Sequence, residues 1–547
     1  CSSASKEGSK CQATTHGPRR RLNGRPQRRP ATGISLHLSQ RDGGRTSTAC
    51  LNVTRITCRN PNPPVDRCLR LAKTVGCYID FSNDKKDNKN KATFSKPDSD
   101  TGFSVKKSTR GWQKRCCLAT LIAVVLSVFS ATLVGGLLDI NREPINYKTA
   151  PVRDRIHLLK QRLEDGSTKL EWDERHGWLP SMLKHLEVPV SSQTLVFSKT
   201  SVQNPRITPA RPRAVYFNDD TYVGWVQYGD VLELSAVDPK QGGIFYVLTQ
   251  EKTNHPEIIR DQGDCLTCHS SSKTKGVPGY LVRSVFASDD GRPHFGFGTT
   301  TTDHTTPMKK RYGGWYVSGT HGGMRHRGNV IAIDDRSNPI DPETGANITD
   351  LNKLFRVKPY LDKGSDIVAL MVLEHQSQMH NLITNASFDC RHALYYQEIM
   401  NRALNRPIDH ETDSTRSRII ASGEKLLQYM LFCDEYQLES PIEGASGFAK
   451  QFSSHGRRDD RGRSLRDFDL NQRMFRYPCS FLIYSDSFDE LPAPLLAHVE
   501  TRLINVLQGK DVSGKFGHLS SGDREAILKI LMETKPGFRE KVKAEGE

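Results

Sequence analysis

The hydrophobic residues after about residue 147 follow two different periods. Between residues 192 and 250, segments such as QTLVFSK and GIFYVLTQ are rich in β-branched and aromatic residues and alternate with Asn, Asp and Gly turns. This pattern predicts strands. From about residue 362, segments such as SDIVALMVLEHQSQMHNLI carry apolar residues at i, i+3 and i+4, which predicts helices. The order predicts an α+β protein with a mixed, strand-rich middle region, 147–360, and a mostly helical region, 361–540.

Capping residues predict the ends of two C-terminal helices. PLLAHVETRLINVLQG stops at Gly509, a residue that favours the left-handed conformation after a helix. The final helix, in SSGDREAILKILMET, has Ser520 or Ser521 as its expected N-cap, and Pro536 lies just beyond its end.

Basic residues are concentrated in the first fifth of the chain. Residues 1–115 contain 25 Lys and Arg but only 8 Asp and Glu, so they supply +17 to a total net charge of +16. They are short of large apolar residues and cannot bury enough surface to offset chain entropy, so we expect a disordered basic cytoplasmic tail. Because the remainder is nearly neutral and the tail has few interleaved aromatic residues, we expect no nucleic-acid partner.

An uncharged apolar run follows this tail. Residues 116–138 contain no charged residue, Lys114 and Arg115 precede them, and Asp139 follows them. A helix of 23 residues is long enough to cross a bilayer, and the flanking charges place the N-terminus in the cytoplasm. The run therefore predicts a transmembrane signal anchor, with cleavage after it as the alternative. It also predicts a single-pass inner-membrane protein whose globular part lies on the periplasmic side.

The sequence GDCLTCHSSS contains the spacing C-x-x-C-H, formed by Cys265, Cys268 and His269. With 13 Cys and 18 His in 547 residues, chance produces on the order of 0.01 such matches, so the spacing is informative. Two thiols at this spacing add to the two vinyl groups of one haem, and the adjacent histidine becomes the proximal iron ligand. The motif predicts one covalently bound haem c.

Two other interpretations of the motif stay open. The same three residues form half of a zinc site, although structural zinc usually requires a second ligand pair and the downstream cysteines, Cys390, Cys433 and Cys479, are isolated. A thioredoxin-type thiol pair would instead lie at the start of a helix in a small βαβ unit.

The partners of a haem iron are less determined than its attachment. A ligating histidine usually donates its other ring N–H to a carbonyl or carboxylate, and Pro278 is a candidate source of that carbonyl. The distal ligand has five main candidates, and a predicted helix adds His375, Met379 and His380. The five candidates within 60 residues of the motif are His304, Met308, His321, Met324 and His326.

Four stretches carry a resemblance to a known family. They are GDCLTCHSSSKTKGVPGYLVRSVF, TTDHTTPMKKRYGGWYVSGTHG, RSLRDFDLNQRMFRYPCSFLIYS and FGHLSSGDREAILKILMETKPG. From about residue 147 to 536, the chain resembles a family of large exported bacterial proteins with a single cytochrome c-type haem-binding domain and otherwise uncharacterised function. The resemblance implies haem binding and electron transfer at Cys265, Cys268 and His269. Unlike small soluble cytochromes, this chain has its motif in mid-chain among strands.

These observations predict a membrane-anchored, single-haem c-type electron-transfer protein with an unidentified redox partner. The alternatives are a haem-dependent oxidoreductase or peroxidase-like enzyme with an open iron, a haem-based sensor, and a zinc-stabilised structural module. The sequence contains no second C-x-x-C-H and no H-E-x-x-H, G-x-S-x-G or phosphate-loop motif.

Overall fold

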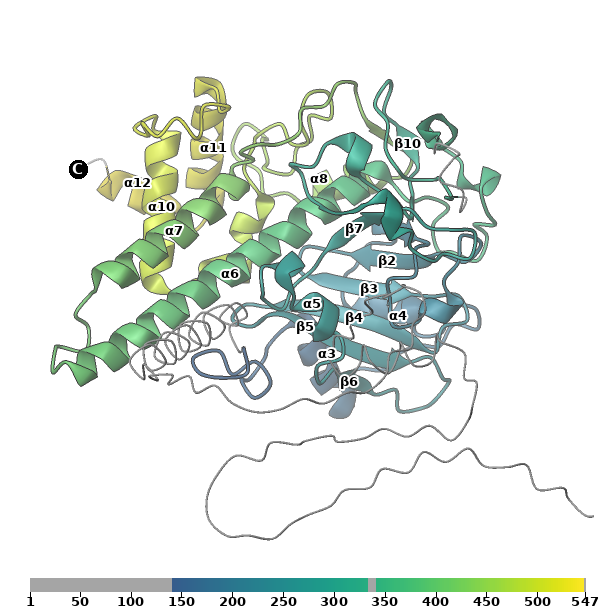
Figure 1. Ribbon diagram of the computed structural model, residues 1–547, viewed down its shortest axis with the longest axis horizontal. Coiled ribbons are helices and arrows are strands. Elements are labelled where there is room, and N and C mark those ends of the chain that lie inside the picture. Colours follow the sequence, from purple (N-terminus) through teal and green to yellow (C-terminus); the bar gives the residue numbers. More distant parts are fainter. Residues whose placement is uncertain (1–139, 333–340, 546–547) are drawn as a thin grey trace, which may run out of the picture. The chain divides into compact units, whose positions relative to one another are not determined.

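A seven-stranded antiparallel sheet forms the centre of the strand-rich region in the computed structural model, which describes residues 140–332 and 341–545 (Figure 1). Its strand order is β6-β5-β4-β3-β2-β1-β9. Two small two-stranded sheets accompany it, one of β7 and β8 and one of β10 and β11. The strands are β1 Thr194–Val196, β2 Arg213–Phe217, β3 Thr221–Trp225, β4 Val231–Asp238, β5 Gly242–Thr249, β6 Ile258–Arg260, β7 Val282–Val285, β8 Thr299–Thr302, β9 Trp315–Tyr316, β10 Gly319–Thr320 and β11 Glu443–Gly444.

Both faces of the large sheet are packed against other elements. One face, the α3 face, includes Tyr216, Val223 and Tyr246 and shares a hydrophobic core with α3 (Arg155–Glu164) and α4 (Leu179–His185). The other, the α6 face, includes Tyr222 and Phe245 and packs in a second core with α6 (Ile367–Ala403). Burial on both sides explains why these strands are rich in apolar residues at successive positions.

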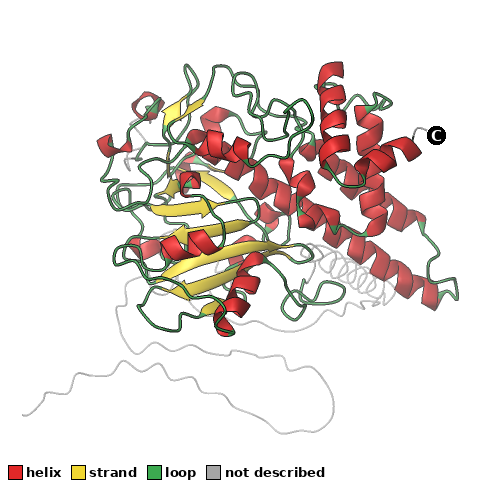
Figure 2. Cartoon of the chain, turned by 180° about the vertical axis from the view of Figure 1, so that it is seen from behind, coloured by secondary structure: helices red, strands yellow, loops and turns green. Residues whose placement is uncertain are grey.

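Helices make up most of the C-terminal half, and the strands and the long helices gather in different parts of the described chain (Figure 2). Helix α6 has 37 residues, and Asp366 caps it by accepting hydrogen bonds from the backbone N–H groups of Val368 and Ala369. The other helices of this half are α7 Asp413–Met430, α8 Phe448–Ser454, α9 Asp486–Asp489, α10 Ala493–Leu507, α11 Ser521–Thr534 and α12 Phe538–Ala544. The predicted α+β arrangement, with a strand-rich middle and a helical C-terminal half, is confirmed.

The predicted helix ends also agree with the structure. Gly509 follows the C-cap of α10 with φ +74°. Ser520, one of the two expected residues, caps α11 and forms a capping box with Asp523.

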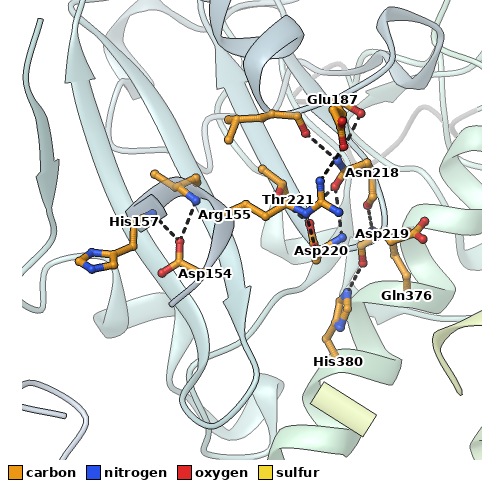
Figure 3. A network of polar contacts seen from close by, with 12 residues as sticks. Asp154, Arg155, His157, Glu187, Asn218, Asp219, Asp220, Thr221, Gln376 and His380 are labelled. Atoms are coloured by element: carbon orange, nitrogen blue, oxygen red, sulfur yellow. Dashed lines mark hydrogen bonds and ion pairs between the residues drawn. The ribbon is translucent and has the colours of Figure 1, made fainter. Parts of the chain in front are cut away.

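The turn between β2 and β3 joins both layers of helices to the sheet (Figure 3). The side-chain oxygen of Asn218 accepts a hydrogen bond from the backbone N–H of Thr221 at 2.9 Å. The backbone carbonyl of Asn218 accepts from Gln376 Nε2 of α6, also at 2.9 Å. Next to it, Asp220 pairs with Arg155 of α3 at 3.0 Å. The turn is therefore fixed from both faces of the sheet.

One part of the predicted fold is corrected. The sequence predicted one transmembrane helix and hence a single-pass inner-membrane location, but no helix within 140–332 and 341–545 is long and apolar enough to cross a membrane. The longest of these helices, α6, places charged and polar side chains such as Glu374 and His375 among its buried residues. The segments predicted as a basic tail, 1–115, and as an anchor, 116–138, lie outside the described residues.

Candidate functional site

The C-x-x-C-H motif forms a single helical turn, α5 (Leu266–His269), which begins directly after Cys265. The backbone N–H of His269 donates to the carbonyl of Cys265 at 2.9 Å, and that of Ser270 donates to Leu266 at 2.8 Å. Residues at i, i+3 and i+4 of a helix lie on one face. The turn therefore presents Cys265, Cys268 and His269 on the same side.

Asp261 holds the start of this turn. Its carboxylate accepts hydrogen bonds from the backbone N–H groups of Gly263 at 2.9 Å and Cys265 at 3.2 Å. Asp261 itself follows β6, and its N–H donates to the carbonyl of Phe245 on β5 at 2.9 Å. The motif is thus tied directly to the edge of the large sheet (Figure 1).

Two hydrogen bonds join His269 to Gly279 and close the loop between them. The N–H of Gly279 donates to the carbonyl of His269 at 2.8 Å, and the imidazole Nδ1 lies 2.8 Å from the carbonyl oxygen of Gly279. The chain reverses at Lys275 and Gly276, which have φ of 61° and 78°. Because a carbonyl only accepts, Nδ1 carries the ring proton, and Nε2 has its lone pair available for a ligand bond.

The carbonyl that receives this bond lies one residue beyond the predicted one. The carbonyl of Pro278 accepts from the backbone N–H of Gly243 at 2.9 Å, so it is used to attach the loop to β5. The kind of partner expected for His269 is present, and its source is Gly279.

The imidazole of His269 packs against an aromatic ring and lies near charged side chains. Its ring centroid lies 4.7 Å from that of Phe245, on the α6 face of the sheet. Burial is the largest cause that lowers the pKa of His269, and the nearby Arg213 lowers it further. The ring is therefore neutral near pH 7, which is the form that binds a metal ion.

The two thiols of the motif differ in environment. Both are free, with Cys268 exposed and Cys265 half-buried. Burial, together with the carboxylate of Asp261, raises the pKa of Cys265 to about 12. Reactive redox thiols need a lowered pKa, so this environment argues against a thioredoxin-type pair.

The geometry also gives little support to zinc. Within the described residues, one group of three acidic, histidine or cysteine side chains brings its ligand atoms within 4.8 Å of one another. It consists of Asp459, Asp460 and Glu533, two of them exposed, and it does not include the motif. A structural zinc site would instead bring four ligands together.

A row of residues that runs from buried to exposed positions crosses the sheet beside the motif. We call this row the outer row. It consists of directly paired positions on β2 to β6 and runs next to the row that contains Phe245. Its members are Val215, Gly224, Glu233, Val247 and Ile259. Ile259 is 47% exposed. Arg213 pairs with Glu233 at 2.6 Å, and a Cβ on Gly224 would lie 2.4 Å from Arg213 Nη2, so this glycine makes room for the guanidinium.

Three of the predicted distal-ligand candidates lie close together and are buried. His321 Nδ1 lies 2.7 Å from the carbonyl of Met324, and its Nε2 accepts from the N–H of Asn347 at 3.0 Å. The ring of His326 lies 4.6 Å from that of His321, and its Nδ1 accepts from the N–H of Gly328. The ring of His326 also lies 5.7 Å from that of Tyr312, and Met324 belongs to the hydrophobic core beside α6.

The other two candidates lie in the core beside α6. His304 Nδ1 is 2.8 Å from Nδ1 of His375, whose Nε2 is 2.8 Å from the Ser480 hydroxyl. The His304 ring also stacks on Tyr429, with centroids 4.0 Å apart. Met308 is 1% exposed and belongs to the same hydrophobic core.

Comparison of the chain with protein-family models, with curated proteins and with solved structures gives no match. The resemblance to the exported c-type haem proteins therefore stays a prediction.

The sequence contained part of the information needed to find these surroundings. Asp261, four residues before Cys265, is a residue type that commonly accepts from backbone N–H groups at the start of a helix. No local pattern identifies the outer row or the α6 side chain that holds the end of the 269–279 loop. These residues come from strands and a helix that are distant from the motif in sequence.

Proposed function

We propose that this protein is a single-haem c-type electron-transfer protein that binds haem covalently at Cys265, Cys268 and His269. The observation that carries the proposal is the His269 side chain. Its Nδ1 donates to the Gly279 carbonyl, its Nε2 is left as the ligand atom, and both cysteines share its face of the helical turn. A hydrogen bond on the non-ligating nitrogen is the usual support of a metal-bound histidine.

The thiols attach the cofactor without an external oxidant. Each cysteine S–H adds across one vinyl group, so that sulfur bonds to one vinyl carbon and the hydrogen ends on the other. The raised pKa of Cys265 keeps this thiol protonated and protects it from oxidation before attachment. His269, neutral because of its burial, binds the iron through Nε2.

The outer row supplies a surface of the chemistry that a porphyrin requires. Val247 and Ile259 are apolar members of this row, which runs next to the row of Phe245, whose ring contacts His269, and Gly224 adds no side chain. Arg213 is the cation of this surface and is suited to a carboxylate such as a haem propionate. Bound haem would supply a one-electron couple, and the exposed Cys268 gives a redox partner access to this side of the turn.

The test is whether haem is attached and where. The full chain would be produced behind an export signal in a bacterium that attaches haem c, and a denaturing gel would be stained for haem. We expect a haem band that disappears in Cys265→Ala/Cys268→Ala and persists in the control Cys433→Ala/Cys479→Ala. Absence of the band in the unsubstituted protein, or its persistence in the motif variant, would refute the proposal.

A second candidate, a haem protein with an open iron position, is favoured by the contacts of the predicted distal ligands. All five candidates are buried, and the ring contacts and hydrogen bonds of the three histidines link them to groups outside the motif. Electronic absorption of the purified haem protein separates the two functions. A six-coordinate low-spin spectrum indicates electron transfer, whereas a high-spin spectrum that changes on adding carbon monoxide indicates ligand chemistry.

A further inference from the structure

The proximal side of the site is supported by a residue of the helical half of the chain. Asn381 of α6 is 1% exposed. Its Oδ1 accepts from the backbone N–H of Tyr280 at 2.8 Å, and its Nδ2 donates to the carbonyl of Tyr280 at 2.7 Å. One buried amide therefore brackets the residue that follows Gly279.

The same amide also lies against Gly279. A Cβ on Gly279 would lie 2.1 Å from Asn381 Oδ1 and 3.0 Å from its Cγ. Only glycine permits this approach, because any other side chain would collide with the amide. Asn381 thus fixes both the position of the Gly279 peptide and the identity of the residue there.

From these contacts we infer that Asn381 is a positioning residue for the proximal histidine: by holding residues 279–280, it aims the Gly279 carbonyl at Nδ1 of His269. This inference rests on the proposed haem site. The carbonyl is held at one end by α6 and, through Pro278 and Gly243, at the other end by β5. Helix and strand together set the hydrogen bond on which the basicity of the ligand depends.

The physical consequence concerns the iron. A hydrogen bond from Nδ1 to a carbonyl makes the imidazole a stronger donor, which stabilises ferric over ferrous iron and lowers the reduction potential. Without Asn381 this bond lengthens or turns away, so the potential rises. A tenfold change in the equilibrium constant of a one-electron reduction corresponds to 59 mV.

The experiment compares Asn381→Leu with a matched substitution on the same helix, Gln376→Leu. Gln376 is also a buried amide, 1% exposed, and it donates to the Asn218 carbonyl at 2.9 Å and to the Tyr222 hydroxyl at 2.8 Å. Both variants lose buried hydrogen bonds, and we expect both to lose thermal stability. In a spectroscopic redox titration, we expect only Asn381→Leu to raise the midpoint potential. The expected shift is about 59 mV, which corresponds to a tenfold change in the equilibrium constant of reduction.

Gly279→Ala is the second variant, because it disturbs the same contact from the loop side and retains Asn381. An upward shift of potential in Gly279→Ala alone supports the inference even if Asn381→Leu does not fold. Haem-loaded variants whose potential equals that of the unsubstituted protein, or a Gln376→Leu shift of equal size, would overturn it. An unsubstituted protein without haem would instead refute the proposed function itself.

Discussion

Arg311 and Glu374 form a buried ion pair that allows a quantitative test of the core beside α6. The two side chains are 3% and 0% exposed, and Arg311 Nη1 lies 3.0 Å from Glu374 Oε2. Arg311 also donates to the carbonyls of Thr306 at 2.7 Å and His304 at 3.0 Å. The arginine therefore satisfies three buried acceptors and joins the loop after β8 to the helix.

Replacing the arginine leaves these acceptors with few other donors. In Arg311→Met, Glu374 retains the Tyr312 hydroxyl at 3.3 Å, and the His304 carbonyl retains the N–H of Tyr436 at 3.0 Å. The loss of one partner of a buried pair costs about 3–5 kcal/mol. We expect a decrease of about 3 kcal/mol, at the lower end of this range, in the free energy of unfolding at pH 8, where Glu374 of the unsubstituted protein is ionised.

The cost should depend on the charge of Glu374. Burial is the largest effect on this carboxyl and raises its pKa to about 7, against the opposing effect of Arg311. At pH 5, or with Glu374→Gln, no carboxylate charge is left unpaired. The remaining loss is then mainly the unsatisfied Thr306 carbonyl, about 1–3 kcal/mol.

The assay is a double-mutant cycle by equilibrium urea unfolding, followed by circular dichroism at pH 8 and pH 5. We expect Arg311→Met to cost about 1 kcal/mol more at pH 8 when residue 374 is glutamate than when it is glutamine, because without Arg311 the pKa of Glu374 rises further and the carboxyl takes up a proton. An equal cost in both backgrounds at pH 8, or a cost below about 1 kcal/mol with glutamate, would refute this reasoning.

Three further predictions concern the same core and the motif. The raised pKa of Glu374 means that the folded state binds the proton of this carboxyl more tightly than the unfolded state does. The stabilisation from this proton is full below about pH 4.5 and is lost as pH rises through about 7. In urea titrations, the stability difference between the unsubstituted protein and Glu374→Gln should therefore fall by about 3 kcal/mol from pH 4.5 to 8. In haem-free protein at pH 8, a maleimide should label exposed Cys268 at least about 100-fold faster than Cys265, whose pKa of about 12 leaves almost no thiolate; equal rates in mass spectrometry would contradict the difference in environment. Gly242→Ala should lower the free energy of unfolding by more than about 1 kcal/mol, because φ is +75° and the new Cβ would lie 2.7 Å from the Pro278 carbonyl; an unchanged urea midpoint would show that the loop yields at this contact.

Much of the fold was predictable because its causes are local. Periods of two and of about 3.6 in the apolar residues separate the strand-rich middle from the helical half. Gly509 and Ser520 end and begin helices through their own backbone conformation and side chain, which need no distant partner. The transmembrane prediction was wrong, because none of the described helices is long and apolar enough to cross a membrane. Residues 116–138, on which this prediction rested, lie outside the described residues.

The candidate site shows where prediction from the sequence reaches its limit. Pro278 was a candidate source of the carbonyl for His269, but its carbonyl accepts from the N–H of Gly243 on β5, a strand that precedes the motif in sequence. His321 was a reasonable ligand candidate by distance along the chain, yet its two ring nitrogens are engaged by the Met324 carbonyl and the Asn347 N–H. Chain proximity does not reveal which hydrogen-bond partners are already taken.

Local sequence patterns specify the alternation of strands and helices and the spacing that puts Cys265, Cys268 and His269 on one face of a helical turn. Both depend on backbone geometry that repeats every two or 3.6 residues. Tertiary packing selects the carbonyl that supports His269 and the sheet face that lies beside it, and it brings Asn381, about 100 residues away, to hold that carbonyl. These depend on packing between distant segments, where burial obliges each polar group to find a partner that sequence separation does not indicate.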